Sequence, residues 1–447
     1  MKNAAFCLLI SIWVFSLGGC GGAKKRTHPR VVIVGLDGAG WEHIDPLIAQ
    51  GRLPLFKKLK EQSAWGTLRT TTPAKSPIIW TSIATGKTTA KHGIDDFRSK
   101  KRSMATGKYQ IFNSTDIRQP LIWEMLGAGN RRSVLVNWYL SFPPQPLNGV
   151  NVSDYYRMRA FQHRDDKQGK VDNTVYPPSL AADFERFVDG DYEKALRETG
   201  LPDFPRLFNE QGGGRQYTDH GILKKYAEFV IQENLVQKLA SHLFRTEEFD
   251  FFASYFKMAD VVQHFAYDCF VDEASKEKWS STFTDAPSWE LENPGAYARV
   301  ADILYPVYRN FEVILEDYLS SEKNKDAYFI ILSDHSFHFF QRDRSLLYNH
   351  VNGMEKAPNG IIMIKGPGVL PGKIALASIF DIAPTVLYLQ GLPLDRDMDG
   401  KPLFKVFSFR NPIRYTRYQK KKPQFQQRSR ELDEKALQEL KALGYIN

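Results

Sequence analysis

The sequence predicts an α/β fold, in which helices cover both faces of a mostly parallel central sheet. Short apolar runs bounded by glycine alternate with longer helical patterns, and this order of elements is typical of parallel sheets. Several runs are followed by an acidic residue, and ligands of such folds bind beyond the carboxyl ends of the strands. With 447 residues, 43% hydrophobic and 25% charged, the chain has a globular composition.

The first predicted strand is the β-branched run 31–34, which Gly35 ends. The loop after this strand carries Asp37. Apolar residues at helical spacing predict a helix around 53–59, and a strand is expected at 64–69.

Ser76 stands at the start of the next predicted helix. Pro77 suits the first turn of that helix and Gly86 suits its end. The serine is therefore interpreted either as a helix cap or as a nucleophile. A helix N-terminus stabilises negative charge, including that of a phosphate, so the two roles are compatible.

The second half of the chain repeats the order of helix, strand and polar loop. Within 220–260 a helix of about twenty residues precedes a strand at 250–255, and a long amphipathic helix at 297–322 precedes a strand within 326–333. A strand within 360–369 and a helix within 377–392 complete the alternation, and 431–445 is expected to form a surface helix.

Residues 98–216 follow a looser pattern, in which polar loops separate short periodic pieces. We interpret this region as an insertion that caps the substrate site. The predicted catalytic core is therefore residues 31–97 together with residues 217–447.

The N-terminus predicts an exported, lipid-anchored protein. Residues 1–20 have a lysine, an apolar run and small residues before Cys20, which together indicate a signal peptide. The ending at residues 17–20 resembles the bacterial lipobox, in which the cysteine is lipidated. Lipidation at Cys20 would leave residues 21–30 as a tether at the cell envelope, on the periplasmic or outer surface. An uncleaved membrane anchor is the alternative. Without Cys7, and with Cys20 lipidated, only Cys269 remains, so no intramolecular disulfide is expected.

The net charge of +9 favours anionic substrates or lipid headgroups. No nucleic-acid recognition motif accompanies this charge, so binding to a nucleic-acid polymer is not expected. The sequence does not predict the oligomeric state.

Residues that suit a metal site follow three of the predicted strands. Asp37 follows the first strand, Asp260 and His264 follow the strand at 250–255, and Asp334 and His335 follow the strand within 326–333. Carboxylate oxygen and imidazole nitrogen are the ligands that divalent metals such as zinc bind in proteins. The four-residue spacing of Asp260 and His264 puts both side chains on one helical face.

These residues lie in stretches that resemble the alkaline phosphatase superfamily, and in particular its bacterial type I phosphodiesterases and nucleotide pyrophosphatases. The resemblance covers nearly the whole mature chain and is carried by "VVIVGLDGAGWE", "SPIIWTSIATG" with "KHGIDDF", "VYPPSL", "KMADVVQHF", "LSDHSF", "NGIIMIKGPGV", "SIFDIAPTVLYLQGLPLDRDMDGKPL" and "LKALGYI". It implies an alkaline phosphatase-like fold and hydrolysis of a phosphoester.

The resemblance also implies two divalent metal ions, expected to be zinc, that flank a serine or threonine nucleophile. Ser76 has the family's spacing for the nucleophile, nine residues before Thr85. By the resemblance, one ion is held by Asp37, Ser76, Asp334 and His335, and the other by Asp260 and His264. Attack by Ser76 would give a covalent phospho-enzyme.

The sequence departs from the family at the third ligand of the second ion. Lys356 stands where the family has a histidine, and a protonated lysine does not bind metal. His350 is one candidate replacement, His338 is another, and a weakly bound or absent second ion is the third possibility. Lys75 and Lys356 are assigned to the substrate.

Because a metal ligand of the family is missing at this position, two other functions remain alternatives. One is a lipid-anchored binding protein with little catalytic activity, and the other is a phospho-group transferase acting on envelope lipid or glycan. A sulfatase of the same superfamily needs a Cys or Ser in a C/S-x-P-x-R setting, which residues 76–79 lack. The substrate itself is not predicted beyond a preference for a phosphodiester.

Overall fold

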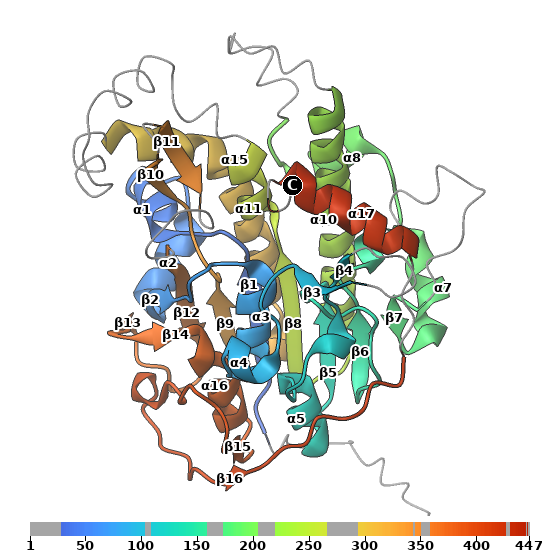
Figure 1. The fold of residues 1–447 in the computed structure, drawn as a ribbon. Coiled ribbons are helices and arrows are strands. Elements are labelled where there is room, and N and C mark those ends of the chain that lie inside the picture. The colour runs from blue at the N-terminus through green and yellow to red at the C-terminus, as the bar shows by residue number, and fades with distance from the viewer. Residues whose placement is uncertain are drawn as a thin grey trace, which may run out of the picture.

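The computed structural model describes residues 28–102, 109–158, 173–203, 220–265, 294–342, 345–349, 358–425, 430–443 and 445. Within these ranges a single large sheet lies between two layers of helices (Figure 1). The signal peptide, Cys20, His350 and Lys356 lie outside the described residues, so the predictions made for them stay predictions.

The centre of the sheet is parallel. Its strand order is β13-β2-β12-β9-β1-β8-β5-β6-β7, and β14 pairs with β2. The parallel strands are β9 (Tyr328–Leu332), β1 (Val31–Leu36), β8 (Phe251–Phe256), β5 (Ser133–Val136) and β6 (Gly149–Val152). The others are β12 (Gly360–Lys365) and β7 (Val175–Tyr176), both antiparallel to their neighbours, and β2 (Ala64–Arg69), β13 (Gly372–Lys373) and β14 (Ala377–Ser378). This arrangement confirms the predicted mostly parallel sheet.

Side chains of β1 alternate between two hydrophobic cores, as the period of a strand requires. Val32 and Val34 belong to one core and Val31 and Ile33 to the other. The first core is covered by α1 (Trp41–Ala49), α2 (Pro54–Gln62), α10 (His220–Thr246), α11 (Met258–Phe265) and α15 (Pro294–Leu319). The second is covered by α3 (Ser76–Thr85), α5 (Ile122–Ala128) and α16 (Ile382–Leu389). Helices therefore cover both faces, as predicted.

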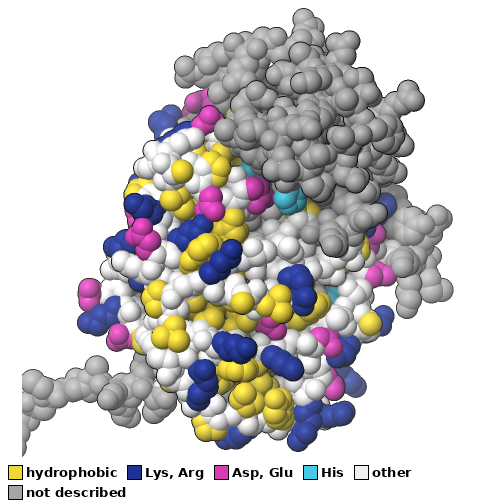
Figure 2. All heavy atoms as spheres, turned by 90° about the vertical axis from the view of Figure 1, so that its left-hand side faces the viewer, with side chains coloured by type: hydrophobic (Ala, Val, Ile, Leu, Met, Phe, Trp, Pro, Cys, Tyr) yellow, Lys and Arg dark blue, Asp and Glu magenta, His cyan; other side chains and the backbone are white. Residues whose placement is uncertain are grey.

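Smaller elements surround this core. The described ones are α4 (Thr89–His92), α7 (Ala181–Phe184), α8 (Tyr192–Thr199) and α17 (Arg430–Ala442), with the two-stranded pairs β3 (Arg98–Arg102) and β4 (Tyr109–Ile111), β10 (His338–Arg342) and β11 (Ser345–Asn349), and β15 (Leu394–Asp395) and β16 (Tyr415–Thr416). On the face shown in Figure 2, lysine and arginine side chains are scattered among hydrophobic and acidic ones. No described helix has the length and apolar composition of a membrane span.

The region 98–216 differs from its interpretation as an insertion. It supplies β5 and β6, which are interior strands of the central sheet and continue it beyond β8. These strands have four residues each, which is too short to give a clear periodic signal among polar loops. The part of this region that contains β5 and β6 therefore belongs to the core sheet.

The helix that carries Ser76 begins one residue earlier than a capping role would require. Lys75 occupies the N-cap position, Ser76 is the first helical residue and Pro77 the second. Gly86 ends the helix with a φ of 69°, in the left-handed region that favours glycine. The serine hydroxyl is thus at the helix N-terminus without being the cap.

Most of the predicted segment 431–445 forms the helix α17, which ends at Ala442, but α17 is not simply a surface helix. Ala436 and Leu440 of α17 are buried in a small hydrophobic cluster with Phe97 and Ile111. Its apolar residues at helical spacing therefore pack against the body of the protein.

Two ion pairs lie shortly after the end of α3, one buried and one more exposed. They allow a comparison of how much each contributes to the free energy of unfolding. Lys87 Nζ lies 2.7 Å from Asp395 Oδ2, with 1% and 2% of the side chains exposed, whereas Lys91 pairs with Asp399 at 38% and 28% exposure. We expect Lys87→Met to lower the free energy of unfolding by about 3–5 kcal/mol, because it leaves a buried carboxylate unpaired. Lys91→Met should cost about 0–1 kcal/mol.

Urea unfolding of both variants measures this difference. Equal losses for the two substitutions would contradict it.

Candidate metal centre

Three adjacent strands bring the predicted ligands to one edge of the sheet. β1 lies between β8 and β9 and is parallel to both, so the residues after these strands meet. Asp37 follows β1, and Asp334 and His335 follow β9. Asp260 and His264 lie in α11, which starts directly after β8. The topology therefore gathers side chains that are far apart in the sequence.

Two hydrogen bonds orient Asp37, and both go to the same oxygen of its carboxylate. Trp80 Nε1 of α3 donates a hydrogen bond of 3.2 Å to Asp37 Oδ2, and the hydroxyl of Tyr255 donates to the same oxygen. Trp80 can reach it because Gly35 leaves room, since a Cβ there would lie 2.6 Å from the Trp80 ring. The other oxygen, Oδ1, is buried and has no hydrogen-bond partner within the described residues.

Asp334 and His335 repeat this arrangement. The backbone N–H of Gly38 donates to Asp334 Oδ1 at 3.4 Å, whereas the buried Oδ2 has no partner in the described part of the chain. His335 Nδ1 lies 3.3 Å from the carbonyl oxygen of Ser336. A carbonyl only accepts hydrogen bonds, so Nδ1 carries the proton and Nε2 carries the lone pair.

Burial and neighbouring charges shift the pKa values of these groups. Burial, followed by the charge of Asp260, raises the pKa of Asp37 to about 7. Burial and the carboxylates of Asp37 and Asp260 raise the pKa of Asp334 well above its usual value. Burial lowers the pKa of His335 to about 4, so its imidazole is neutral at physiological pH.

Asp260 is the carboxylate that stays ionised. Burial alone would raise the pKa of Asp260, but His264, His335 and a hydrogen bond from Tyr445 outweigh it and lower the pKa. Asp260 Oδ1 lies 3.4 Å from His264 Nε2 and 4.0 Å from His335 Nε2. The two groups of predicted ligands are therefore neighbours.

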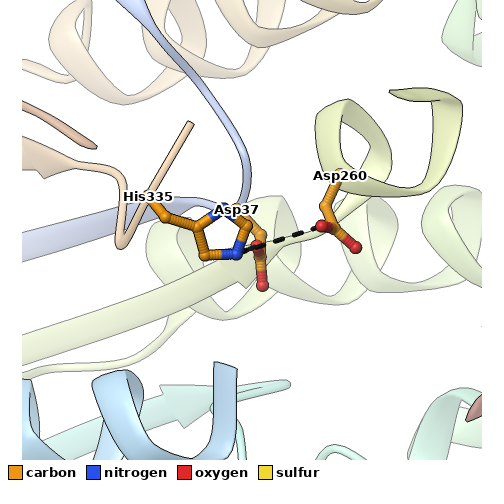
Figure 3. A group of neighbouring side chains, drawn as sticks. All are labelled: Asp37, Asp260 and His335. Carbon is orange, nitrogen blue, oxygen red and sulfur yellow. Dashed lines mark ion pairs between the residues drawn. The ribbon is translucent and has the colours of Figure 1, made fainter. Parts of the chain in front are cut away.

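The spacing of these atoms fits bound cations. Two ligands of a tetrahedral zinc ion, with bonds of about 2.0–2.2 Å, lie roughly 3.4 Å apart. His335 Nε2 is 3.4 Å from both Asp37 Oδ1 and Asp334 Oδ2, and these are the two oxygens without a hydrogen bond. Figure 3 shows Asp37, Asp260 and His335 turned toward one another, and one ligand atom of each lies within 4.8 Å of the others.

A cavity adjoins this cluster. It has about 70 Å³ open to the centres of water molecules, and its lining includes Asp37, Ser76 and Asp260. The predicted nucleophile and carboxylates from both predicted ion sites therefore share one space. Lys75 instead pairs with Asp96 at 2.7 Å, and its assignment to the substrate stays a prediction.

The sequence analysis missed a second group of residues in the same cavity. Arg157, Lys257, Glu439 and Tyr445 also line it. Tyr445 lies in the stretch "LKALGYI" that carried the family resemblance, but nothing in that stretch indicates a chemical role. The position of this segment over the cavity depends on tertiary packing, which sequence periodicity does not report.

The family is settled by a match over most of the chain. Residues 31–389 match the family of type I phosphodiesterases / nucleotide pyrophosphatases. The chain belongs to this family. The predicted relationship is confirmed, and membership supports a phosphoester hydrolase, although it identifies neither the nucleophile nor the metal.

One solved structure supports the fold. A 2-O GAG sulfatase is 11% identical with a TM-score of 0.50, covering 86% of this chain and 75% of that chain. A phosphonate monoester hydrolase from Silicibacter pomeroyi is 12% identical with a TM-score of 0.45, covering 86% and 77%. At 11% identity the likeness to the sulfatase bears on the fold and not on the substrate.

The raised pKa of Asp37 predicts how the metal-free protein responds to pH. The folded pKa of about 7 lies above the ordinary value of 3.8, so between these pH values the folded protein binds more protons and its stability falls as the pH rises. Asp37→Asn removes this loss of stability at higher pH, because the asparagine side chain does not titrate. Relative to wild type, the variant should gain on the order of 3 kcal/mol between pH 4 and pH 7.5.

Urea unfolding in the presence of a chelator, at several pH values, measures the difference. A difference that does not change with pH would contradict the raised pKa of Asp37.

Proposed function

We propose that the protein is a metal-dependent phosphodiesterase that uses Ser76 as its nucleophile. The observation that carries this proposal is the shared cavity lined by Ser76, Asp37 and Asp260. Membership of the phosphodiesterase and pyrophosphatase family supports the same reaction class.

In this proposal Asp37, Asp334 and His335 hold one divalent ion beside Ser76, and Asp260 and His264 hold a second. Zinc suits this donor set of carboxylates and neutral imidazoles. The ions would supply charge that favours the serine alkoxide and stabilises the oxygens of the phosphoryl group. Hydrogen bonds from Trp80 and Tyr255 keep Asp37 oriented with one oxygen toward the ion.

The position of Ser76 supports its proposed role in attack on phosphorus. It is 3% exposed and is the first residue of α3, where the helix dipole favours negative charge. In the first step the bond from Ser76 Oγ to phosphorus forms as the bond to the leaving oxygen breaks. In the second step water attacks phosphorus, the bond from Ser76 Oγ to phosphorus breaks, the phosphate monoester leaves and a proton from the water returns to Ser76 Oγ.

The proposal extends to location and substrate. The signal sequence ending at Cys20 supports a lipid anchor at the bacterial envelope, where the enzyme would meet phosphodiesters of the cell surface or periplasm. Since Ser76 is followed by Pro-Ile-Ile and not by a C/S-x-P-x-R pattern, sulfate esters are expected to be poor substrates despite the structural likeness to a sulfatase.

Hydrolysis of bis-p-nitrophenyl phosphate by the zinc-loaded protein tests the proposal. Ser76→Ala should lower kcat/KM by at least about 10³-fold, because no other group replaces a lost nucleophile. The variant should keep its bound metal. p-Nitrophenyl sulfate should react much more slowly with the wild type.

Ser82→Ala is the matched control on the same helix. Its hydroxyl pairs with His92 Nε2 at 3.1 Å, so the substitution should cost about 1 kcal/mol of stability and leave turnover unchanged. Metal-independent turnover, or full activity of Ser76→Ala, would rule out the proposed mechanism. Bound metal without any turnover would instead favour a binding protein.

A further inference from the structure

Tyr445 lies three residues beyond α17 and brings its hydroxyl to the ligands proposed for the second ion. Tyr445 Oη lies 3.0 Å from Asp260 Oδ1 and 2.9 Å from Asp260 Oδ2. It also lies 2.9 Å from His264 Nε2. A single oxygen atom therefore contacts both residues that would hold this ion.

Packing fixes the position of Tyr445. Its ring lies 4.5 Å from the ring of Phe97 and 4.8 Å from the ring of His264, between centroids. Glu439 of α17 is buried and forms an ion pair of 2.8 Å with Arg157, and it accepts a hydrogen bond of 2.7 Å from Gln232 Nε2. The segment is thus anchored to the protein body by both apolar and charged contacts.

The three ligand atoms have the spacing of one face of a tetrahedral site. Asp260 Oδ1, His264 Nε2 and Tyr445 Oη form a triangle with sides of 3.4, 2.9 and 3.0 Å. The ligands of a tetrahedral zinc ion lie roughly 3.4 Å apart, so small outward shifts would place all three at bonding distance. Catalytic zinc sites usually have three protein ligands, and Asp260 and His264 supply two.

We propose that Tyr445 is the third protein ligand of the ion held by Asp260 and His264. The inference rests on the proposed metal-dependent function and adds a residue to it. The ion would then tie the segment after α17 to α11, beside the cavity that Asp260 and Tyr445 line together with Ser76. In the alternative, Tyr445 only hydrogen-bonds to Asp260 and His264, and the ion binds on their other side.

Metal titration of Tyr445→Phe tests the proposal. The substitution keeps the ring that packs on Phe97 and removes only the oxygen. Wild type should bind two Zn²⁺ per chain, and the variant should bind the second more than about 100-fold more weakly, since loss of an outer partner of a metal ligand costs only about 10–100-fold. The visible spectrum of the Co²⁺-loaded protein, which reports coordination, should change as well.

Tyr418→Phe is the control, because its hydroxyl bonds to the carbonyl oxygen of Pro393 at 2.9 Å, a residue outside the proposed metal centre. It should bind both ions as wild type does. Equal affinity and an equal Co²⁺ spectrum for Tyr445→Phe would overturn the proposal while leaving the proposed function intact. A wild type that binds no second ion would overturn both.

A crystal structure of the zinc-loaded wild type gives an answer that does not depend on how a variant folds. A distance of about 2.0–2.2 Å between Zn²⁺ and Tyr445 Oη supports ligation. A distance near that of a hydrogen bond or longer overturns it.

Discussion

Three carboxylates buried side by side repel one another, and the arrangement of the whole sheet edge follows from this. Asp37, Asp260 and Asp334 each lie at the end of a parallel strand or in the first turn of the following helix, and all are almost fully buried. Protonation relieves the repulsion in the metal-free protein, as the raised pKa values of Asp37 and Asp334 show. A bound cation relieves it without consuming protons, which is why such a cluster suits a metal site.

The scaffold orients these charges and does not neutralise them. Trp80 connects the helix that carries Ser76 to Asp37, and the absence of a side chain at Gly35 allows this approach. His335 is kept neutral by burial and oriented by the carbonyl of Ser336. The groups that fix the geometry are therefore buried in the core, so the site is formed before any ligand arrives.

Much of this could be predicted from sequence because it depends on local patterns. The strand before Asp37, the helix starting near Ser76, and the convergence of Asp260 and Asp334 follow from short apolar runs and the rule that parallel strands end at one edge. The strands β5 and β6 were missed because four residues between polar loops carry little periodicity. The placement of Tyr445 could not be predicted, since it depends on how α17 packs against residues such as Phe97.

The strands β5 and β6 also cover the second edge of β8, the strand that precedes Asp260. β8 pairs with β1 on one edge and with β5 on the other, so the strand that leads to Asp260 has no open edge. A shortened chain without β5 and β6 would leave the backbone N–H and C=O groups along the apolar β8 exposed. Such an edge pairs readily with another chain. Removing this region would thus expose a sheet edge that is prone to self-association.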